Sequence, residues 1–361
     1  MTNDNAPARR MMLITGATGF IGSRLAARAM EQCYAVKTLT RSDWDGQPAV
    51  PLAQRYFGSL PGPIPVESFQ GVEVVVHCAA EVENKPRSAE AVNVEGTRRL
   101  AELARQNGAR TFIFLSSQSA RPDALSAYGR TKHAAEQLLL NLDGLNVIIL
   151  RPGLVTGPGS RGLFQRMSNM VRALPVVPLL AGGRSIVQPI HVDDLCNAIL
   201  RCCERADGLN KAVLHLGDAQ GVSLAEFLQT VATAQLGRRK LMLSIPLWPV
   251  KGAVRLAEAL RIPLPINSNN LRGLKVVEKM ETRTDMERLG IAPRPLKQAV
   301  RAEAADPKTG TLSLQERPAR VLLVGAGRVG LVHAVTLSRL RGVRLAGLVD
   351  RKKGATALLK G

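Results

Sequence analysis

Apolar positions in the first 150 residues fall into short continuous runs, and between these runs they recur every three or four positions. Continuous runs are typical of parallel strands covered on both faces, and the wider spacing is typical of amphipathic helices. The chain is therefore predicted to begin with an α/β, Rossmann-like doubly wound parallel sheet. Strands are predicted at 11–15, 35–40, 73–78, 111–116 and 146–151, and helices at about 22–31, 90–107 and 126–141.

The pattern changes after Pro152, where glycine and proline become frequent and the loops lengthen. We predict one domain over 11–303, in which 11–151 mainly binds a dinucleotide and 152–303 forms a smaller C-terminal substrate lobe. Residues 1–10 are expected to be disordered. Within the lobe, helices are predicted at 193–205 and 223–236, and an apolar helix between loops at 241–266.

The last part of the chain resembles a second beginning. Residues 304–319 are predicted to be a linker, and the strand 321–324 then runs into the glycines of Gly325-Ala326-Gly327-Arg328-Val329-Gly330. Asp350 follows 20 positions after the last glycine, a typical place for an acid that bonds a ribose. One βαβ unit cannot bury both faces of its strands. Residues 320–361 are therefore predicted to be a partial second Rossmann unit.

Composition narrows the function. The net charge is +20, but arginines are spread along the chain and only 3% of residues are aromatic, so we expect no nucleic-acid partner. No segment reaches the roughly 20 apolar residues of a membrane span, and no signal peptide is evident, so a cytoplasmic location is expected. The five cysteines lack metal-ligand spacing, so no metal is expected. Cys33, Cys78 and Cys196 are predicted to be small buried thiols.

Residues 15–22 form a glycine-rich turn directly after the apolar run 11–14, with a helix expected from Ser23 to Met30. Gly16 permits a tight turn, Gly19 lets the backbone approach a pyrophosphate, and Gly22 allows close packing of helix on strand. The N-terminus of the helix then attracts phosphate. The turn therefore predicts a dinucleotide site.

A tyrosine and a lysine stand four positions apart at the start of the predicted helix 126–141. This spacing places Tyr128 and Lys132 on one face, where the ammonium can lower the pKa of the phenol for acid–base work. The preceding strand ends in Ser116-Ser117, where a hydroxyl can orient a substrate oxygen beside the tyrosine.

Seven motifs occur in the order found in one enzyme superfamily. They are TGATGFIG (15–22), HCAA (77–80), NVEGT (93–97), FLSS (114–117), YGRTK (128–132), RPGLVTGPG (151–159) and HVDDL (191–195). As a set they resemble the extended short-chain dehydrogenase/reductases, the NAD(P)-dependent epimerase/dehydratase superfamily, over about residues 10–303. The resemblance implies that Ser117, Tyr128 and Lys132 are catalytic. Cofactor contacts are implied for Gly16, Gly19, Phe20, Ile21, Gly22, Cys78, Ala79, Ala80, Asn93, Tyr128, Lys132, Gly153 and Val155.

The end of the second strand decides which dinucleotide is used. Arg41 and Ser42 offer a guanidinium and a hydroxyl suited to a 2′-phosphate, so NADP(H) is expected. Asp43 lies nearby and is suited to NAD. Ser59 and Leu60 stand where the family often has Asp-Leu, which implies an altered contact with the adenine.

The resemblance leaves the substrate open. The family implies an NAD(P)-dependent epimerase/dehydratase or reductase that moves a hydride at a hydroxyl-bearing carbon of a small molecule, first a sugar or nucleotide sugar. Nucleotide-sugar enzymes commonly place an arginine where this chain has Val187, although Arg184 is near. The alternatives are a dehydrogenase of a bulky alicyclic, steroid-like alcohol and a non-catalytic NADP(H)-binding assembly or sensor protein. A homodimer is one expected assembly.

The tail carries a resemblance of its own. The loop 325–330, His333 and Asp350 are similar to the truncated N-terminus of a Gfo/Idh/MocA-type oxidoreductase. Because the unit is incomplete, we expect it to bind no second dinucleotide.

Overall fold

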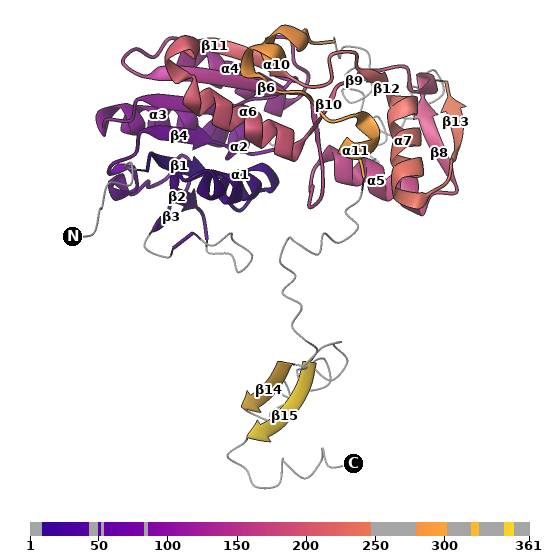
Figure 1. Ribbon diagram of the computed structural model, residues 1–361, viewed down its shortest axis with the longest axis horizontal. Helices are drawn as coiled ribbons and strands as arrows, with labels where there is room; N and C mark the ends of the chain where they lie inside the picture. The colour runs from indigo at the N-terminus through magenta and orange to yellow at the C-terminus, as the bar shows by residue number, and fades with distance from the viewer. Residues whose placement is uncertain are drawn as a thin grey trace, which may run out of the picture. The chain divides into compact units, whose positions relative to one another are not determined.

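The computed structural model describes residues 9–42, 50–51, 54–82, 86–246, 279–301, 319–324 and 343–349. The chain divides into two compact units, Met1–Ala302 and Glu303–Gly361 (Figure 1). None of the helices within the described ranges is long and apolar enough to cross a membrane.

A seven-stranded sheet forms the centre of the first unit, with every neighbouring pair of strands parallel. Its strands are β1 (Met11–Thr15), β2 (Ala35–Thr40), β3 (Arg55–Phe57), β4 (Val74–His77), β5 (Thr111–Leu115), β6 (Asn146–Pro152) and β11 (Ala212–Leu216). Their order across the sheet is β11-β6-β5-β4-β1-β2-β3. The order reverses between β1 and β4, and ligands of such sheets bind at the carboxyl ends of the strands at this point. The predicted sheet is confirmed, although β3 and β11 were not predicted.

Helices cover both faces of the sheet, because successive side chains of a strand point to opposite sides. Met12 and Ile14 of β1 pack in one core with α1 (Phe20–Glu31) and α6 (Val192–Glu204). Leu13 packs in the other core, with α3 (Gly96–Gln106) and α4 (Ala127–Leu140). Burying one such leucine contributes about 1.5–3 kcal/mol.

Two helices differ in detail from the prediction. The first, α1, begins at Phe20 and not at Ser23, because Gly16 adopts a positive φ of 70° and the chain turns early enough for Gly19 to precede the helix. The helix predicted at 90–107 is three consecutive segments, namely α2 (Pro86–Glu90), a π-helical turn η3 (Ala91–Glu95) and α3.

Outside the sheet, the part of the chain after β6 forms a smaller lobe whose described residues contain three pairs of short strands. The pairs are β7 (Leu154–Thr156) with β10 (Pro189–His191), β9 (Ile186–Val187) with β12 (Val222–Ser223), and β8 (Val176–Leu180) with β13 (Leu241–Ile245). A separate apolar core, which includes Phe164 and Phe227, joins α5 (Leu163–Ala173) to α7 (Leu224–Leu236). Two short helices complete the described lobe, α10 (Arg283–Leu289) and α11 (Leu296–Ala299). The described residues of the unit also form the single-turn helices η2 (Val66–Phe69), η4 (Ala181–Gly183) and η5 (Ala206–Leu209).

Two predictions are wrong in this unit. The helix predicted at 241–266 begins as the strand β13, because residues 241–245 pair with β8; residues 247–278 lie outside the described residues. Cys33 is exposed and not buried, since it follows α1 in a turn with a φ of 63°. Cys196 is buried as predicted, and Cys78 is partly buried.

The second unit is described only at β14 (Ala319–Val324) and β15 (Val343–Val349), which pair in parallel. The strand expected at 321–324 is confirmed. The loop 325–330, His333, Asp350 and most of the expected linker 304–319 lie outside the described residues, as do residues 1–8.

Candidate active site

The glycine-rich turn closes against the loop that follows β4. A Cβ on Gly16 would lie 2.7 Å from the Ala79 amide nitrogen, and a Cβ on Gly22 would lie 2.3 Å from the Gly16 oxygen. Both positions therefore require glycine, because the backbone itself occupies the space that a side chain would take. The turn ends at the N-terminus of α1, where the first amide groups of a helix are free to bind phosphate. The residues present fit a dinucleotide, and Phe20 and Ile21 form the first turn of that helix.

A buried histidine connects the turn to the neighbouring helix. His77 Nδ1 lies 2.6 Å from the Thr15 hydroxyl, and His77 Nε2 lies 3.0 Å from the Thr97 hydroxyl. Burial, together with the charge of Lys132, holds the pKa of His77 well below its usual value, so the ring is neutral. His77 is therefore a residue of the buried core.

Asn93 lies in the π-helical turn η3 and is almost completely buried. Its amide group bonds both the backbone nitrogen and the carbonyl of Glu81, at 2.8 and 3.0 Å, and its Nδ2 donates to the Thr131 hydroxyl at 3.0 Å. Asn93 thus ties the loop after β4, which begins at Cys78-Ala79-Ala80, to α4 beside Lys132. Its direct contact with the cofactor stays a prediction.

The structure brings Ser117, Tyr128 and Lys132 together at the carboxyl end of β5. The side chains of Ser117 and Tyr128 share a hydrogen bond, and Ser117 Oγ also lies 3.0 Å from Ser119 Oγ. Lys132 Nζ lies 6.0 Å from the centre of the Tyr128 ring and donates to the Leu115 carbonyl at 2.7 Å. Ser126 caps α4 by accepting a bond from the Gly129 amide at 3.0 Å, which orients the first turn that carries Tyr128.

The pKa values in this cluster differ from the expectation. Burial raises the pKa of Tyr128 to about 12, and the bond with Ser117 offsets only part of that rise. The expected lowering by Lys132 is wrong for the protein alone, because the ammonium points to the Leu115 carbonyl and desolvation dominates. Burial also lowers the pKa of Lys132 to about 8, against the opposing effects of Cys78 and Glu136.

A buried acid–base cluster beneath the trio was missed by the sequence analysis. Glu136 on α4 accepts hydrogen bonds from Ser116 Oγ and from both Nε and Nη2 of Arg151, the Nε bond measuring 2.9 Å. One available feature was the spacing, because Glu136 stands one helical turn after Lys132. The partner Arg151, on another strand, could not be identified from spacing.

The residues expected to contact the adenosine part of the cofactor are exposed or form hydrogen bonds within loops. Arg41 and Ser42 are exposed directly after β2, and the Thr40 hydroxyl donates to the Ser42 carbonyl at 3.1 Å. Asp43 lies outside the described residues. Leu60 is placed against α3, where a Cβ on Gly96 would lie 2.7 Å from its own Cβ. The Ser59 amide donates to the Pro63 carbonyl at 3.2 Å.

Gly153 and Val155 lie where the sheet joins the lobe. A Cβ on Gly153 would lie 2.0 Å from the Gln188 carbonyl oxygen, so no other residue fits there without a backbone shift. Val155 is in β7 opposite Ile190 of β10. Their contact with a cofactor stays a prediction.

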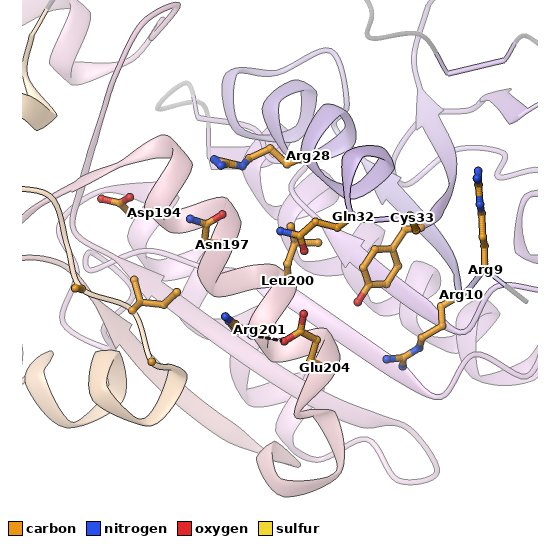
Figure 2. A pocket seen from close by; sticks show the side chains of 14 residues that line it. Arg9, Arg10, Arg28, Gln32, Cys33, Asp194, Asn197, Leu200, Arg201 and Glu204 are labelled. Carbon is orange, nitrogen blue, oxygen red and sulfur yellow. Dashed lines mark hydrogen bonds and ion pairs between the residues drawn. The ribbon is translucent and has the colours of Figure 1, made fainter. Parts of the chain in front are cut away.

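A cavity of about 910 Å³ lies apart from the trio, between the end of α1, α6 and residues 290–292 (Figure 2). Three of its arginines already have carboxylate partners: Arg10 pairs with Glu73, Arg28 with Asp193 and Arg201 with Glu204. None of the predicted site residues lines this cavity, so it is not the predicted active site.

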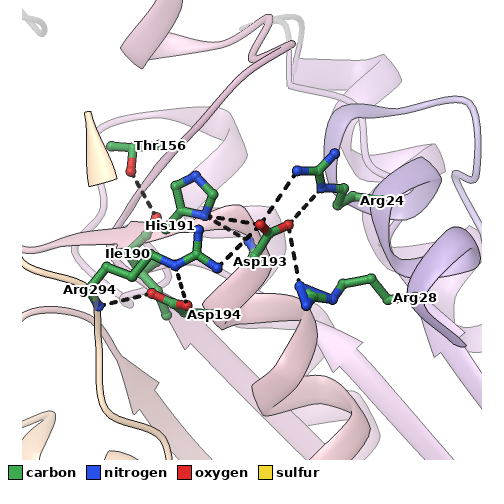
Figure 3. A network of polar contacts seen from close by, with 8 residues as sticks. All are labelled: Arg24, Arg28, Thr156, Ile190, His191, Asp193, Asp194 and Arg294. Atoms are coloured by element: carbon green, nitrogen blue, oxygen red, sulfur yellow. Dashed lines mark hydrogen bonds and ion pairs between the residues drawn. The ribbon is translucent and has the colours of Figure 1, made fainter. Parts of the chain in front are cut away.

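The HVDDL motif forms a network of hydrogen bonds and ion pairs on the face of the sheet that α1 and α6 cover (Figure 3). His191 caps α6 by accepting a bond from the Asp193 amide at 3.2 Å. Asp193 pairs with Arg24 at 2.6 Å and with Arg294 at 3.3 Å, and Asp194 pairs with Arg294 at 3.0 Å. His191 therefore caps a helix, and the motif joins α1 to the described end of the lobe.

The family model described as the NAD dependent epimerase/dehydratase family matches residues 12–217, which is more than half of the chain. The chain belongs to this enzyme family. The match contains the glycine-rich turn, the trio and the HVDDL motif, and a nicotinamide dinucleotide is the cofactor typical of the family. Because the match ends at residue 217, the resemblance of the tail to a Gfo/Idh/MocA-type enzyme stays a prediction.

Similar proteins act on different substrates. The chain is 35% identical over 208 residues to "Ceramide reductase" of Caulobacter vibrioides (strain NA1000 / CB15N), a match that covers 54% of this chain and only 62% of that protein. It is 28% identical over 272 residues to "UDP-glucose 4-epimerase" of Vibrio cholerae, covering 67% and 80% of the two chains. The solved structure "MoeE5 in complex with UDP-glucuronic acid and NAD" is 25% identical, with a TM-score of 0.64 over 80% of this chain and 96% of that chain.

Proposed function

We propose that this protein is an NAD(P)(H)-dependent oxidoreductase that moves a hydride at a hydroxyl-bearing carbon, with Tyr128, Lys132 and Ser117 as its catalytic residues. The observation that carries the proposal is the Ser117–Tyr128 hydrogen bond with Lys132 one turn away, at the sheet edge where the glycine-rich turn also ends. The bound dinucleotide supplies or accepts the hydride.

The protonation states suit a proton exchange at the substrate oxygen. With a pKa of about 12, Tyr128 holds its proton at neutral pH and is ready to give it to a carbonyl oxygen as that oxygen gains negative charge. Ser117 positions the same oxygen. In the reverse direction a phenolate at Tyr128 accepts the proton of an alcohol.

The preferred dinucleotide in this proposal is NADP(H). Its support is the exposed guanidinium of Arg41 at the end of β2, where a 2′-phosphate is held in sheets of this type. The alternative is NAD, which is present in the structure of MoeE5.

Two substrate classes remain in competition. A sugar or nucleotide sugar is supported by the named relatives that act on or bind UDP-sugars. A bulky apolar alcohol or ketone is supported by Val187 at the position expected for a diphosphate-binding arginine and by two exposed apolar side chains on the loops that lead to α4 and follow β4. Val82, next to Glu81 in the loop held by Asn93, is 70% exposed, and Leu125, three residues before Tyr128, is 37% exposed.

One experiment tests the function and separates the classes. The purified protein is titrated with NADPH and NADH. It is assayed for conversion of UDP-glucose in the presence of NAD(P)+ by analysis of the sugar product, and for reduction of a 3-ketosteroid by oxidation of NAD(P)H. Co-purified ligands are identified by mass spectrometry. Dinucleotide binding together with turnover of either probe, or a co-purified sugar or apolar alcohol, supports the proposal. Protein that binds dinucleotide and turns over nothing, with no ligand other than dinucleotide, supports the non-catalytic alternative.

A further inference from the structure

The catalytic helix α4 carries a buried carboxylate for which the proposed reaction has no use. Glu136 has no exposed surface, and all its neighbours in hydrogen bonds come from the ends of two strands. A charged group in such a place is costly unless it is paired. Glu136 stands four residues after Lys132, so the two side chains lie on the same face of α4, one turn apart.

The two residues that bond to Glu136 stand at the carboxyl ends of the strands beside the trio. Ser116 directly precedes Ser117, and its amide donates to the Leu150 carbonyl at 2.8 Å, next to Arg151. Glu136 therefore ties the catalytic helix to the ends of β5 and β6. Ser116, the hydroxyl partner of Glu136, is the chain neighbour of Ser117, and Lys132 stands one turn before Glu136 on the same helix.

The charge balance in this region depends on Glu136. Lys132 is 1% exposed and donates to the Leu115 carbonyl, whereas Arg151 is the cation bonded to the Glu136 carboxylate. Without Glu136, the buried Lys132 would lose the carboxylate that stands one turn away on α4, and the partly buried Arg151 would lose its partner. The groups that face Lys132 or Glu136 from the surrounding elements are His77 and Cys78 from β4 and its loop, Phe114 and Leu115 from β5, Tyr128 and His133 from α4, and Arg151 from β6. His77 is neutral, and burial raises the pKa of Cys78 to about 12, so the carboxylate that pairs with Arg151 is the acidic group of this set.

We propose that Glu136 is a positioning residue that keeps the Lys132 ammonium protonated, and that Arg151 limits this effect by sharing the carboxylate. The inference deepens the proposed function and rests on it, because it requires Lys132 to hold the bound dinucleotide. It predicts opposite consequences for the loss of the anion and the loss of the second cation.

The test measures NADPH affinity by fluorescence over about pH 6 to 10, a range that brackets the pKa of Lys132, about 8. Wild-type affinity falls as Lys132 loses its proton. In Glu136→Gln the midpoint of this fall moves down by about one pH unit, because the ammonium loses a stabilising charge. In Arg151→Gln the midpoint moves up, since Glu136 is then shared with no second cation. The control Glu102→Gln, which removes an exposed partner of Arg98 on α3, leaves the midpoint unchanged.

Each result decides. A folded Glu136→Gln protein with an unchanged midpoint overturns the inference. If Glu136→Gln does not fold, Arg151→Gln alone decides, because an upward shift supports the inference and any other result overturns it. Lys132→Met separates this inference from the proposed function. If that variant keeps the pH-dependent fall, the role proposed for Lys132 fails and this inference fails with it; if the fall disappears, a failure of the glutamate variant concerns this inference alone.

Discussion

Two clusters of carboxylates and arginines lie on opposite faces of the same sheet and are built differently. On one face, Glu136 is buried without exposure and is held by Ser116 and Arg151 beneath the trio. On the other face, the Asp193 side chain is 12% exposed, and its arginine partners Arg24, Arg28 and Arg294 are exposed by about a third. The first cluster joins a helix to neighbouring strand ends, and the second joins three distant stretches of chain.

The difference shows that the same chemistry serves two purposes. Charges that are partly exposed and drawn from distant segments hold elements together, at a modest gain for each pair. A fully buried carboxylate is expensive, and it stands one turn from Lys132. We therefore expect changes on the face of α4 to affect chemistry and changes on the face of α6 to affect stability.

The largest effect is expected on the face of α4. Tyr128→Phe removes the proton-transfer group and keeps the ring, so turnover should fall by about 10²–10⁴-fold while the dinucleotide still binds. The measurement is steady-state turnover of whichever probe substrate the wild-type protein converts. NADPH affinity and thermal stability are the controls. Near wild-type turnover in this variant would refute the assignment of Tyr128.

The second effect tests the face of α6. Asp193→Asn leaves Arg24, Arg28 and Arg294 without their common anion, and we expect a loss of about 2–3 kcal/mol in the free energy of unfolding, because these partners are partly solvated. Denaturant unfolding measures this loss. The control Glu204→Gln removes an exposed pair on the same helix and should change stability by less than about 0.5 kcal/mol. Equal losses in both variants contradict the structural role of Asp193.

The same cluster predicts a pH dependence of stability. Burial opposes ionisation of Asp193, but the bond from Arg24 and the charges of Arg24, His191 and Arg28 outweigh it and hold the pKa of this carboxyl below its usual value. Its stabilising contribution is therefore present above the ordinary aspartate pKa of about 3.9 and is lost as the pH falls through the lower, folded value. Asp193→Asn should reduce this acid-induced loss of stability.

A third, smaller effect concerns an arginine that belongs to neither cluster. Arg41 is exposed, and no carboxylate of the described residues pairs with it. Arg41→Ala should weaken NADPH binding by about tenfold, equivalent to about 1.4 kcal/mol, and leave NADH binding nearly unchanged. Arg201→Ala, which removes an exposed cation elsewhere, is the control. Equal affinities of the wild-type protein for NADPH and NADH would remove the basis of this prediction.

The last prediction concerns the second unit, which holds neither cluster, and here we expect no effect on the number of dinucleotides bound. Cutting the chain after Thr309 should leave the stoichiometry at one dinucleotide per chain, because one βαβ unit leaves strand edges and apolar faces without cover. Calorimetry of the full and shortened chains measures the number of sites. Two sites in the full chain, with one lost on shortening, would contradict the prediction.

Much of the sheet could be predicted because its strands are continuous apolar runs. Because β1 and β5 are covered on both faces, nearly all their residues are apolar, and this pattern is visible in the sequence. The glycine-rich turn and the Tyr128–Lys132 spacing also involve only residues that are close together along the chain. The strands of the lobe are shorter, and β13 was mistaken for part of a helix because its pairing with β8, more than 60 positions away, has no local trace.

The sequence by itself determined the alternation of strands and helices over residues 11–151, the turn at Gly16, the serine that follows one strand, and the tyrosine and lysine at the start of the next helix. These features depend on residues close together along the chain. Only the tertiary structure decided that Glu136 meets Arg151, that Asp193 meets Arg294, and that the pKa of Tyr128 lies above its usual value. Burial and charge pairing depend on which distant segments fold against one another, and no spacing along the chain specifies that.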